Sequence, residues 1–181
     1  MRQRFFFCPA CGAELIKRFL TGRERLVCCR CGRVHYENPI VGVAAIILNA
    51  EGQILMVKRS PNITYSGLWC IPCGYLEYDE DVRAGLAREI EEETNLVVQP
   101  LEVFAVHSNF HNPQQHTVGI WFLTKVLAGT PTAGDDASEV AWVEIADPPP
   151  LAFATDQLVL AELLEKKQSI DIEDKVHNHQ K

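Results

Sequence analysis

The stretch GYLEYDEDVRAGLAREIEEETNL, residues 74–96, decides the fold more than any other part of the chain. Read as an α-helix, it places Glu89, Glu92 and Glu93 within about a 100° arc of the helix surface. Carboxylates this close repel one another by roughly 3 kcal/mol per pair at an effective dielectric constant near 20. A divalent cation relieves that repulsion, and Mg²⁺ prefers carboxylate oxygen. The window therefore predicts a helix that holds magnesium.

The alternative interpretation is a solvated acidic helix face, which is what most runs of charge are. Leu86 and Ile90 argue against it, because they lie one turn apart and give the helix an apolar side. Glu91 points roughly opposite Glu89 and is expected to face solvent. A helix that packs on one side and gathers acids on another favours the metal site.

The window has the form G-x5-E-x7-R-E-U-x-E-E-x-x-U, where U is a bulky aliphatic residue, and it resembles the signature of the Nudix hydrolases. Upstream, Trp69, Pro72 and Gly74 are similar to the W-x-x-P-G-G sequence that precedes this signature. Two positions depart from the family pattern. Cys73 replaces the first glycine of that upstream sequence, which puts a side chain near the backbone that would approach metal and phosphate. Asn95 replaces a glycine after the paired glutamates, and asparagine tolerates the left-handed conformation of a helix C-cap.

The resemblance implies an α/β (α+β) fold, the Nudix αβα sandwich with a mixed β-sheet. It implies a hydrolase that uses Mg²⁺ (or Mn²⁺) to cleave the diphosphate bond of a nucleoside diphosphate derivative. The metal ligands that it implies are the Gly74 carbonyl and the carboxylates of Glu89, Glu92 and Glu93. Arg88 would orient a neighbouring glutamate, and the general base would be either Glu93 or Glu139. The catalytic candidates are therefore Arg88, Glu89, Glu92, Glu93 and Glu139.

A second motif stands at the N-terminus, where two CxxC pairs are each followed by glycine: Cys8 with Cys11, and Cys28 with Cys31. This spacing is typical of a zinc ribbon with four cysteine ligands. A segment this short does not bury a self-sufficient core, so a structural Zn²⁺ would stabilise it. Two disulfides are the competing explanation, but seven cysteines and the lack of a secretory leader oppose it. We expect a zinc ribbon over 1–37, a catalytic domain over 38–167 and a polar tail over 168–181.

Hydrophobic patterning predicts alternating strands and helices in the catalytic domain. Residues 41–48 and 54–59 are expected to form a hairpin around the turn 49–52, and 68–71 a short strand before the metal helix. Later strands are expected at 96–108, 117–127 and 139–145. A last helix is expected at 155–167, capped by Thr155 or Asp156. His111 and His116 fall in a polar loop that we expect to be solvated.

Composition and charge limit the remaining choices. The apolar fraction is 47%, the formal net charge is −7, and no apolar run approaches the ~18 residues of a membrane span. The start of the chain does not have the pattern of a signal peptide, and metal-type cysteine spacing indicates a reducing, cytoplasmic setting. The ribbon is basic and the rest of the chain is acidic. We expect this asymmetry to dock the ribbon on the catalytic domain rather than to bind nucleic acid.

With its ribbon, the chain is similar to small zinc-ribbon Nudix hydrolases that act as pyrophosphatases on ADP-ribose, FAD or related dinucleotides. A nucleotide derivative such as ADP-ribose or FAD is the substrate that this resemblance implies. Alternatives are an NADH pyrophosphatase or NAD-cap RNA hydrolase, although residues 97–115 lack the S-Q-P-W-P-F-P-x-S array of those enzymes. A further alternative, motivated by Cys73, is a catalytically weak module that senses a nucleotide. A homodimer would fit the family, but no residue pattern decides it.

Overall fold

The computed structural model describes the backbone of residues 4–178 and the side chains of residues 4–166. Two compact units meet at the bond between Asn38 and Pro39, and each is described by itself. The N-terminal unit contains three antiparallel strands in the order β1-β2-β3: β1 (Leu15–Leu20), β2 (Arg23–Cys28) and β3 (Val34–His35). Its buried core contains Cys8, Ala13, Leu15 and Cys28. A core this small needs a cross-link or a metal to hold the strands together.

The C-terminal unit contains a four-stranded sheet in the order β7-β4-β9-β8. Its strands are β4 (Ile40–Ile46), β7 (Cys73–Tyr75), β8 (Leu96–Asn109) and β9 (Thr117–Gly129). Strands β4 and β9 run parallel, whereas β4 with β7 and β8 with β9 are antiparallel. A second, antiparallel sheet has the order β10-β5-β6, formed by β5 (Ile54–Arg59), β6 (Trp69–Cys70) and β10 (Ala137–Val143).

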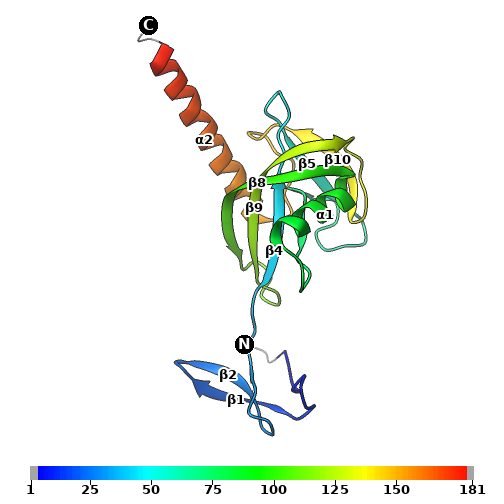
Figure 1. Ribbon diagram of the computed structural model, residues 1–181, viewed down its shortest axis with the longest axis vertical. Helices are drawn as coiled ribbons and strands as arrows, with labels where there is room; N and C mark the ends of the chain where they lie inside the picture. Colours follow the sequence, from blue (N-terminus) through cyan, green and yellow to red (C-terminus); the bar gives the residue numbers. More distant parts are fainter. Residues whose placement is uncertain (1–3, 179–181) are drawn as a thin grey trace. The chain divides into compact units, whose positions relative to one another are not determined.

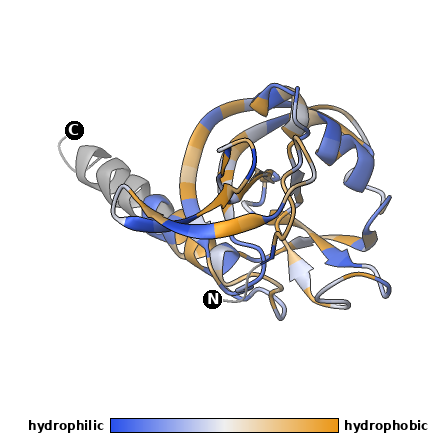
Figure 2. Ribbon diagram, turned by 90° about the horizontal axis from the view of Figure 1, so that it is seen from below, coloured by the Kyte–Doolittle hydropathy of each residue, from blue (hydrophilic) through white to orange (hydrophobic). Residues whose placement is uncertain are grey.

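Two helices cover opposite faces of the four-stranded sheet. Helix α1 (Val82–Thr94) packs Leu86 and Ile90 in a cluster with Val43 and Phe122. Helix α2 (Ala154–Asn178) packs Val159, Leu160 and Leu163 in a separate cluster with Ala44, Ile46 and Trp121. Neighbouring residues of β4 thus face different helices, as strand geometry requires. Figure 1 shows α1 lying across β4, and Figure 2 shows that α1 is largely hydrophilic beside more hydrophobic strands. The predicted αβα sandwich with a mixed sheet is confirmed.

Two residues, Asp81 and Asn95, fix the ends of α1. Asp81 is the N-cap, and its Oδ1 accepts hydrogen bonds from the backbone N–H groups of Arg83 at 2.9 Å and Ala84 at 3.3 Å. Asn95 is the C-cap in the left-handed conformation, with φ 58° and ψ 25°, and its N–H reaches the Glu91 carbonyl. The asparagine that departs from the family pattern therefore still supplies the cap.

The expected hairpin between residues 41–48 and 54–59 was wrong. The chain does turn back, because Asn49 donates its N–H to the Gln53 carbonyl and Leu48 bridges to Ile54. Beyond that point β4 and β5 enter different sheets. Both strands are largely buried and pair with other strands instead of with each other. Strand β4 pairs with β7 and β9, and β5 pairs with β6 and β10, all of which come later in the chain.

Two further boundaries differ from the prediction. The expected strand over 68–71 ends at Cys70, and a short strand β7 that the patterning did not predict follows Pro72 in the other sheet. The last helix starts at Ala154 and its backbone stays helical to Asn178, so the expected end at Lys167 and the cap at Thr155 or Asp156 were wrong. Asp156 lies inside the first turn, and residues 179–181 of the expected polar tail lie outside the described residues. No helix in the described part of the chain has the length and apolar character to cross a membrane.

Candidate active site

A pocket of about 530 Å³ opens between the two sheets and the C-terminal end of α1. It brings together two of the three predicted metal-binding glutamates, Glu89 and Glu93, with the predicted ligand Gly74. Among the described residues that line the pocket, six carry carboxylates and one, Arg59, carries a guanidinium. The acidic ones are Glu77, Glu89, Glu93, Asp135, Asp136 and Asp156.

Gly74 and Glu89 fit against each other. Gly74 lies in β7 opposite Val43, on the side of the sheet that α1 covers. A Cβ at this position would overlap the carboxylate of Glu89. The missing side chain therefore leaves the space that this carboxylate occupies, directly beside the backbone of β7. Burial raises the pKa of Glu89, although Arg88 opposes the shift.

Glu89, Glu92 and Glu93 are called the box glutamates below. Glu93 is the most deeply buried of them, with 4% of its surface exposed. Its Oε2 accepts a hydrogen bond from the backbone N–H of Cys73 at 2.9 Å. Burial raises the pKa of Glu93 to about 8, and the negative charges of Glu89 and Asp136 add to the shift. A cation close to Glu93 would stabilise the ionised form of this buried carboxylate. Cys73 keeps the N–H donor of the residue it replaces, while its side chain packs among apolar neighbours.

Arg88 and Glu92 lie beside the pocket rather than in its lining. The Arg88 guanidinium bonds to Glu80 through two nitrogens, to Glu89 at 3.0 Å and to Glu92 at 2.9 Å. It also donates to the Tyr75 carbonyl at 3.3 Å. Arg88 therefore aligns carboxylates on α1, and Glu92 is exposed outside the pocket lining, paired with Arg88.

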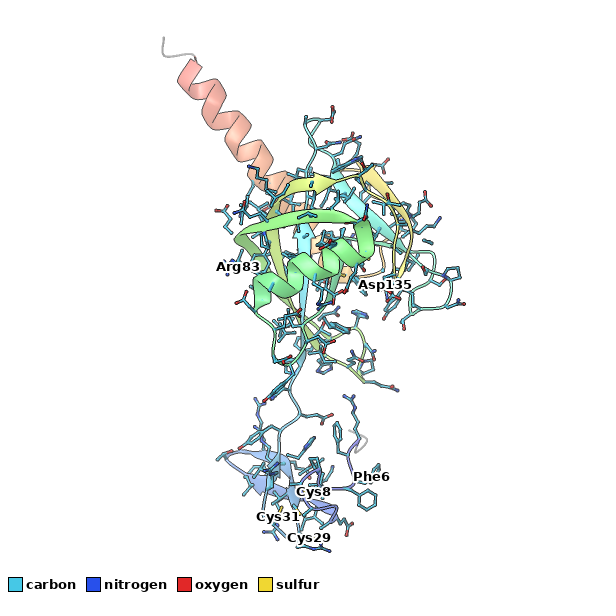
Figure 3. The ribbon with its side chains drawn as sticks, turned by 45° about the vertical axis from the view of Figure 1, so that its right-hand side comes forward. Phe6, Cys8, Cys29, Cys31, Arg83 and Asp135 are labelled. Atoms are coloured by element: carbon cyan, nitrogen blue, oxygen red, sulfur yellow. The ribbon has the colours of Figure 1, made fainter. Side chains whose placement is uncertain are left out.

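The structure does not bring Glu139 into the pocket. Glu139 lies on β10, and its carboxylate pairs with Lys58 on β5 at 3.2 Å, on an exposed surface. Asp135 and Asp136 line the pocket instead. Their loop is tied to α1, because Gly134 donates its N–H to the Glu93 carbonyl at 3.0 Å. Figure 3 shows Asp135 at one end of α1 and Arg83 at the other. The adjacent acids after Gly134 were the sequence signal that patterning passed over.

Other lining residues also escaped the sequence reading. Asp156 is 2% exposed, and its Oδ2 accepts a hydrogen bond from the backbone N–H of Ile71 at 3.1 Å. Burial raises the pKa of Asp156 to about 7. Tyr65, His111 and Phe153 contribute aromatic rings. His111 was expected to be solvated; it is exposed, but it also lines the pocket. These residues belong neither to a hydrophobic run nor to a charged helix face, so sequence patterning does not predict their place in the pocket.

The donor set fits a divalent metal. Carboxylate and carbonyl oxygens are the ligands that Mg²⁺ and Mn²⁺ prefer. The described residues of the pocket oppose one guanidinium to six carboxylates, so the field inside it repels an anionic phosphate unless cations bind first. Glu89, Glu93 and the backbone at Gly74 lie together in the pocket, where their oxygen atoms would bind such a cation. Glu92 is not among the lining residues, and its carboxylate is paired with Arg88.

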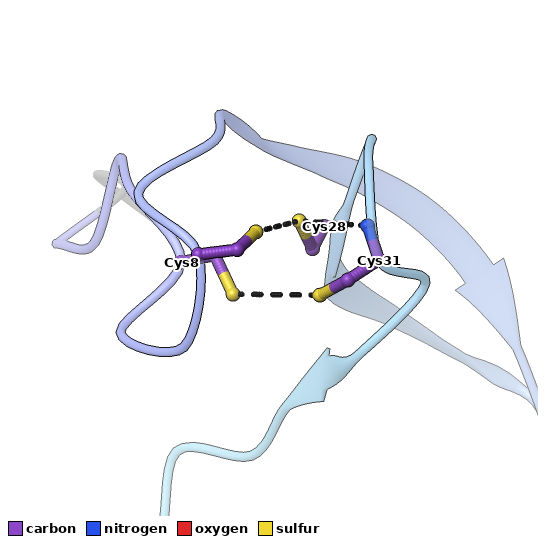
Figure 4. Close-up of side chains that lie close together, drawn as sticks. Cys8, Cys28 and Cys31 are labelled. Atoms are coloured by element: carbon purple, nitrogen blue, oxygen red, sulfur yellow. Dashed lines mark hydrogen bonds between the residues drawn. The ribbon is translucent and has the colours of Figure 1, made fainter.

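A second cluster with metal-binding chemistry lies in the N-terminal unit. The Sγ atoms of Cys8, Cys11, Cys28 and Cys31 all lie within 4.8 Å of one another. Sγ of Cys8 is 3.8 Å from that of Cys31, and Sγ of Cys11 is 3.4 Å from that of Cys28 (Figure 4). Tetrahedral zinc with Zn–S bonds of ~2.3 Å holds its sulfurs about 3.8 Å apart. The predicted four-cysteine cluster is therefore present, and its spacing is that of a zinc site.

Local backbone geometry shapes this cluster. Gly12 and Gly32, which follow the two CxxC pairs, have φ values of 69° and 72° that favour glycine. Their N–H groups return to the carbonyls of Cys8 and Cys28. The backbone N–H of Cys31 is the main cause that lowers the pKa of the Cys28 thiol to about 6, which favours the thiolate that binds metal. Cys29 is exposed and lies outside the cluster.

Comparison with known proteins finds a matching family for each of the two units. The sequence profile of the NUDIX domain matches residues 38–164, and that of the Nudix N-terminal zinc ribbon matches residues 7–37. The chain therefore belongs to the Nudix hydrolase family.

Individual relatives are similar over different lengths. An ADP-ribose pyrophosphatase from Methanocaldococcus jannaschii is 34% identical over 125 residues, which is 68% of this chain and 73% of the relative. An NAD-capped RNA hydrolase, NudC, from Stutzerimonas stutzeri is 32% identical over 55% of this chain and 34% of the relative. The crystal structure of a NUDIX hydrolase from Nitrosomonas europaea superposes with a TM-score of 0.78 at 32% identity. That match covers 91% of this chain and 93% of the other.

Proposed function

We propose that the chain is a Mg²⁺-dependent pyrophosphatase that cleaves the diphosphate bond of ADP-ribose, with FAD as the second candidate substrate. The observation that carries the proposal is the acidic pocket of the Nudix unit, in which Glu89 and Glu93 meet the backbone at Gly74. The similarity to an ADP-ribose pyrophosphatase, which extends over 73% of that relative, supports this choice of substrate.

Gly74, through its carbonyl, and the carboxylates of Glu89, Glu92 and Glu93 would hold the metal. When bound, the metal neutralises charge on the phosphate oxygens and lowers the pKa of a coordinated water. Glu93 is held in place by the Cys73 N–H. The general base, either Glu93 or one of the loop acids Asp135 and Asp136, accepts the proton of the attacking water. The water oxygen bonds to phosphorus, the bridging P–O bond breaks, and two phosphate monoesters leave.

Other side chains position these groups. Arg88 aligns Glu80, Glu89 and Glu92 and does not touch the substrate. Arg59 lines the pocket with its Nε fixed by the Thr64 carbonyl at 2.7 Å, so its guanidinium is available to the diphosphate. The general base is the point on which this proposal departs from the sequence prediction. Glu93 is kept as a candidate, and the loop acids Asp135 and Asp136 replace Glu139 beside it.

The same proposal extends to the ribbon and the setting of the protein. The four clustered thiols would bind one structural Zn²⁺, and thiolate ligands need a reducing compartment such as the cytoplasm. The zinc ion would give the small N-terminal unit the stability that its core lacks. We propose the unit 1–37 as the ribbon and 38–167 as the catalytic domain.

The test is a panel of ADP-ribose, FAD, NADH, diadenosine polyphosphates and nucleoside triphosphates, each assayed with and without Mg²⁺. We expect AMP and ribose 5-phosphate from ADP-ribose, with a turnover that needs the metal. Glu93→Gln keeps the acceptor for the Cys73 N–H but loses the charge, and is expected to lower kcat by about 10²-fold or more. Preference for triphosphates, or full activity of Glu93→Gln, would contradict the proposal. Tight nucleotide binding without turnover would favour a sensing module.

A second candidate is the hydrolysis of NAD-capped RNA, favoured by the similarity to NudC. NADH and an RNA with a 5′-NAD cap therefore belong in the same panel. A kcat/KM for capped RNA above that for ADP-ribose, falling steeply with salt, would favour this candidate.

A further inference from the structure

Three aromatic rings from separate segments meet inside the pocket, at a place that the hydrolytic chemistry does not use. Tyr65 comes from the loop between β5 and β6, His111 from the loop between β8 and β9, and Phe153 from the segment before α2. The ring centroids of Tyr65 and His111 are 5.3 Å apart, those of Tyr65 and Phe153 5.7 Å, and those of His111 and Phe153 6.0 Å. These separations are those of edge and tilted aromatic contacts.

The rings are only partly covered. Tyr65 and Phe153 are half-buried and pack on one side against a small buried cluster that contains Val57 and Cys70. His111 is exposed, and all three rings line the pocket. Rings that line a pocket while leaving surface uncovered provide a place where another ring can stack.

The backbone holds this arrangement at a cost. Tyr65 has a φ of 64°, a left-handed conformation that a bulky residue rarely adopts. His111 is held by Asn109, whose Oδ1 accepts a hydrogen bond from the His111 backbone N–H at 3.2 Å and also contacts its Nδ1. Strained and locally fixed side chains of this kind gather at ligand sites.

Arg59 connects the rings to the phosphate-binding part of the pocket. Its guanidinium carbon lies 5.4 Å from the centroid of the Phe153 ring. Arg59 is also the one lysine or arginine among the described residues that line the pocket. A nucleotide carries its base one sugar away from its phosphate. An anion drawn to Arg59 therefore leaves its base within reach of Phe153 and Tyr65.

We propose that Tyr65, His111 and Phe153 form the subsite that stacks the adenine ring of the substrate. This inference rests on the proposed function for the identity of the ring, while the binding of a base to the three side chains can be measured without metal or turnover. Stacking on the base is equally strong in the ground state and in the transition state, so the subsite contributes to KM and leaves kcat unchanged.

The experiment is saturation-transfer NMR on the full chain with adenosine, which carries no phosphate and needs no metal. Phe153→Leu removes the aromatic face while keeping an apolar side chain. Phe110→Leu is the matched control, because Phe110 precedes His111 on the loop between β8 and β9 but is exposed and absent from the pocket lining. We expect about tenfold weaker adenosine binding in Phe153→Leu and wild-type binding in Phe110→Leu.

A second pair of variants, at Tyr65, tests the subsite if Phe153→Leu does not fold. Tyr65→Asn suits the left-handed backbone and removes the ring, and Tyr65→Phe keeps the ring. We expect Tyr65→Asn to raise KM for ADP-ribose about tenfold with kcat little changed, and Tyr65→Phe to stay at the wild-type value.

The outcomes separate the two proposals. Hydrolysis of ADP-ribose with wild-type KM in both Phe153→Leu and Tyr65→Asn overturns the subsite and leaves the proposed function standing. Adenosine binding that depends on Phe153, without hydrolysis of ADP-ribose, supports the subsite and overturns the proposed function. Equal losses in Phe153→Leu and Phe110→Leu also overturn the subsite.

Discussion

Two parallel hydrogen bonds join the guanidinium of Arg88 to the carboxylate of Glu80: Nε lies 2.7 Å from Oε1 and Nη2 lies 2.9 Å from Oε2. These bonds are the main cause that lowers the pKa of Glu80 to about 2. With Glu80 holding one edge of the guanidinium, Nη1 reaches both Glu89 and Glu92. A single side chain thereby sets the position of carboxylates that would otherwise repel one another.

Arg88→Lys is expected to lower kcat about 10- to 100-fold, because an ammonium group keeps the charge but cannot bond to three carboxylates in a fixed plane. Steady-state kinetics with ADP-ribose and Mg²⁺ measures the effect. Arg83→Lys makes the same change in the first turn of α1, where Arg83 lies over the Phe122 ring, and should stay near the wild-type rate. A wild-type kcat in Arg88→Lys would show that the network does not position the site.

Asp136 and Glu139 give opposite expectations although three positions separate them. Asp136→Asn should lower kcat/KM about tenfold or more, because Asp136 lines the pocket and acts on Glu93. Glu139→Gln should stay within about twofold, because its carboxylate pairs with Lys58 outside the pocket and exposed ion pairs contribute little. The reverse result, with Glu139→Gln inactive and Asp136→Asn normal, would restore the original prediction for the general base.

The zinc content of two variants distinguishes a cysteine that binds the metal from one that does not. The purified chain is expected to contain about one zinc per molecule, bound by four thiolates. Cys28→Ser should lose most of it, since Cys28 belongs to the cluster, whereas Cys29→Ser should keep it, since Cys29 is exposed and outside the cluster. Elemental analysis after dialysis measures both variants. Full zinc in Cys28→Ser, or no zinc in the wild-type protein, would reject the site.

The buried carboxyl group of Asp156 should make the free energy of unfolding depend on pH. Burial raises its pKa from 3.8 to about 7 in the folded protein, so the unfolded chain binds fewer protons between these two pH values. The free energy of unfolding should therefore fall as pH rises from about 4 to about 7, by on the order of 4 kcal/mol from this group. Asp156→Asn keeps an acceptor for the Ile71 N–H and removes the titrating charge, so its stability should vary less over that range.

Urea unfolding at pH 4, 5.5 and 8 measures this difference through tryptophan fluorescence, because Trp69, Trp121 and Trp142 all lie in the C-terminal unit. The two proteins are expected to be similar at the lowest pH, and the variant more stable at the highest. Parallel curves for the two proteins would mean that Asp156 does not carry the effect.

The parts that the sequence determined by itself are local. Helical periodicity was sufficient to put Leu86 and Ile90 in the core, with the box glutamates on another side of α1. Asn95 could be predicted as a left-handed cap, and the two CxxC pairs could be predicted as one cluster. In each case the residues are a few positions apart, or carry a motif whose chemistry is specific, so their backbone geometry is set by short-range hydrogen bonds and turns.

Tertiary structure alone decided which strands pair and which loops meet. The run 41–48 looked like one arm of a hairpin, but β4 pairs in parallel with β9, more than seventy positions away. A buried strand takes whichever partners cover it, and no local pattern encodes that choice. For the same reason Asp136 and Phe153 enter the pocket while Glu139 does not. A polar or aromatic residue in a loop has no periodicity, so its role depends on which distant segments fold beside it.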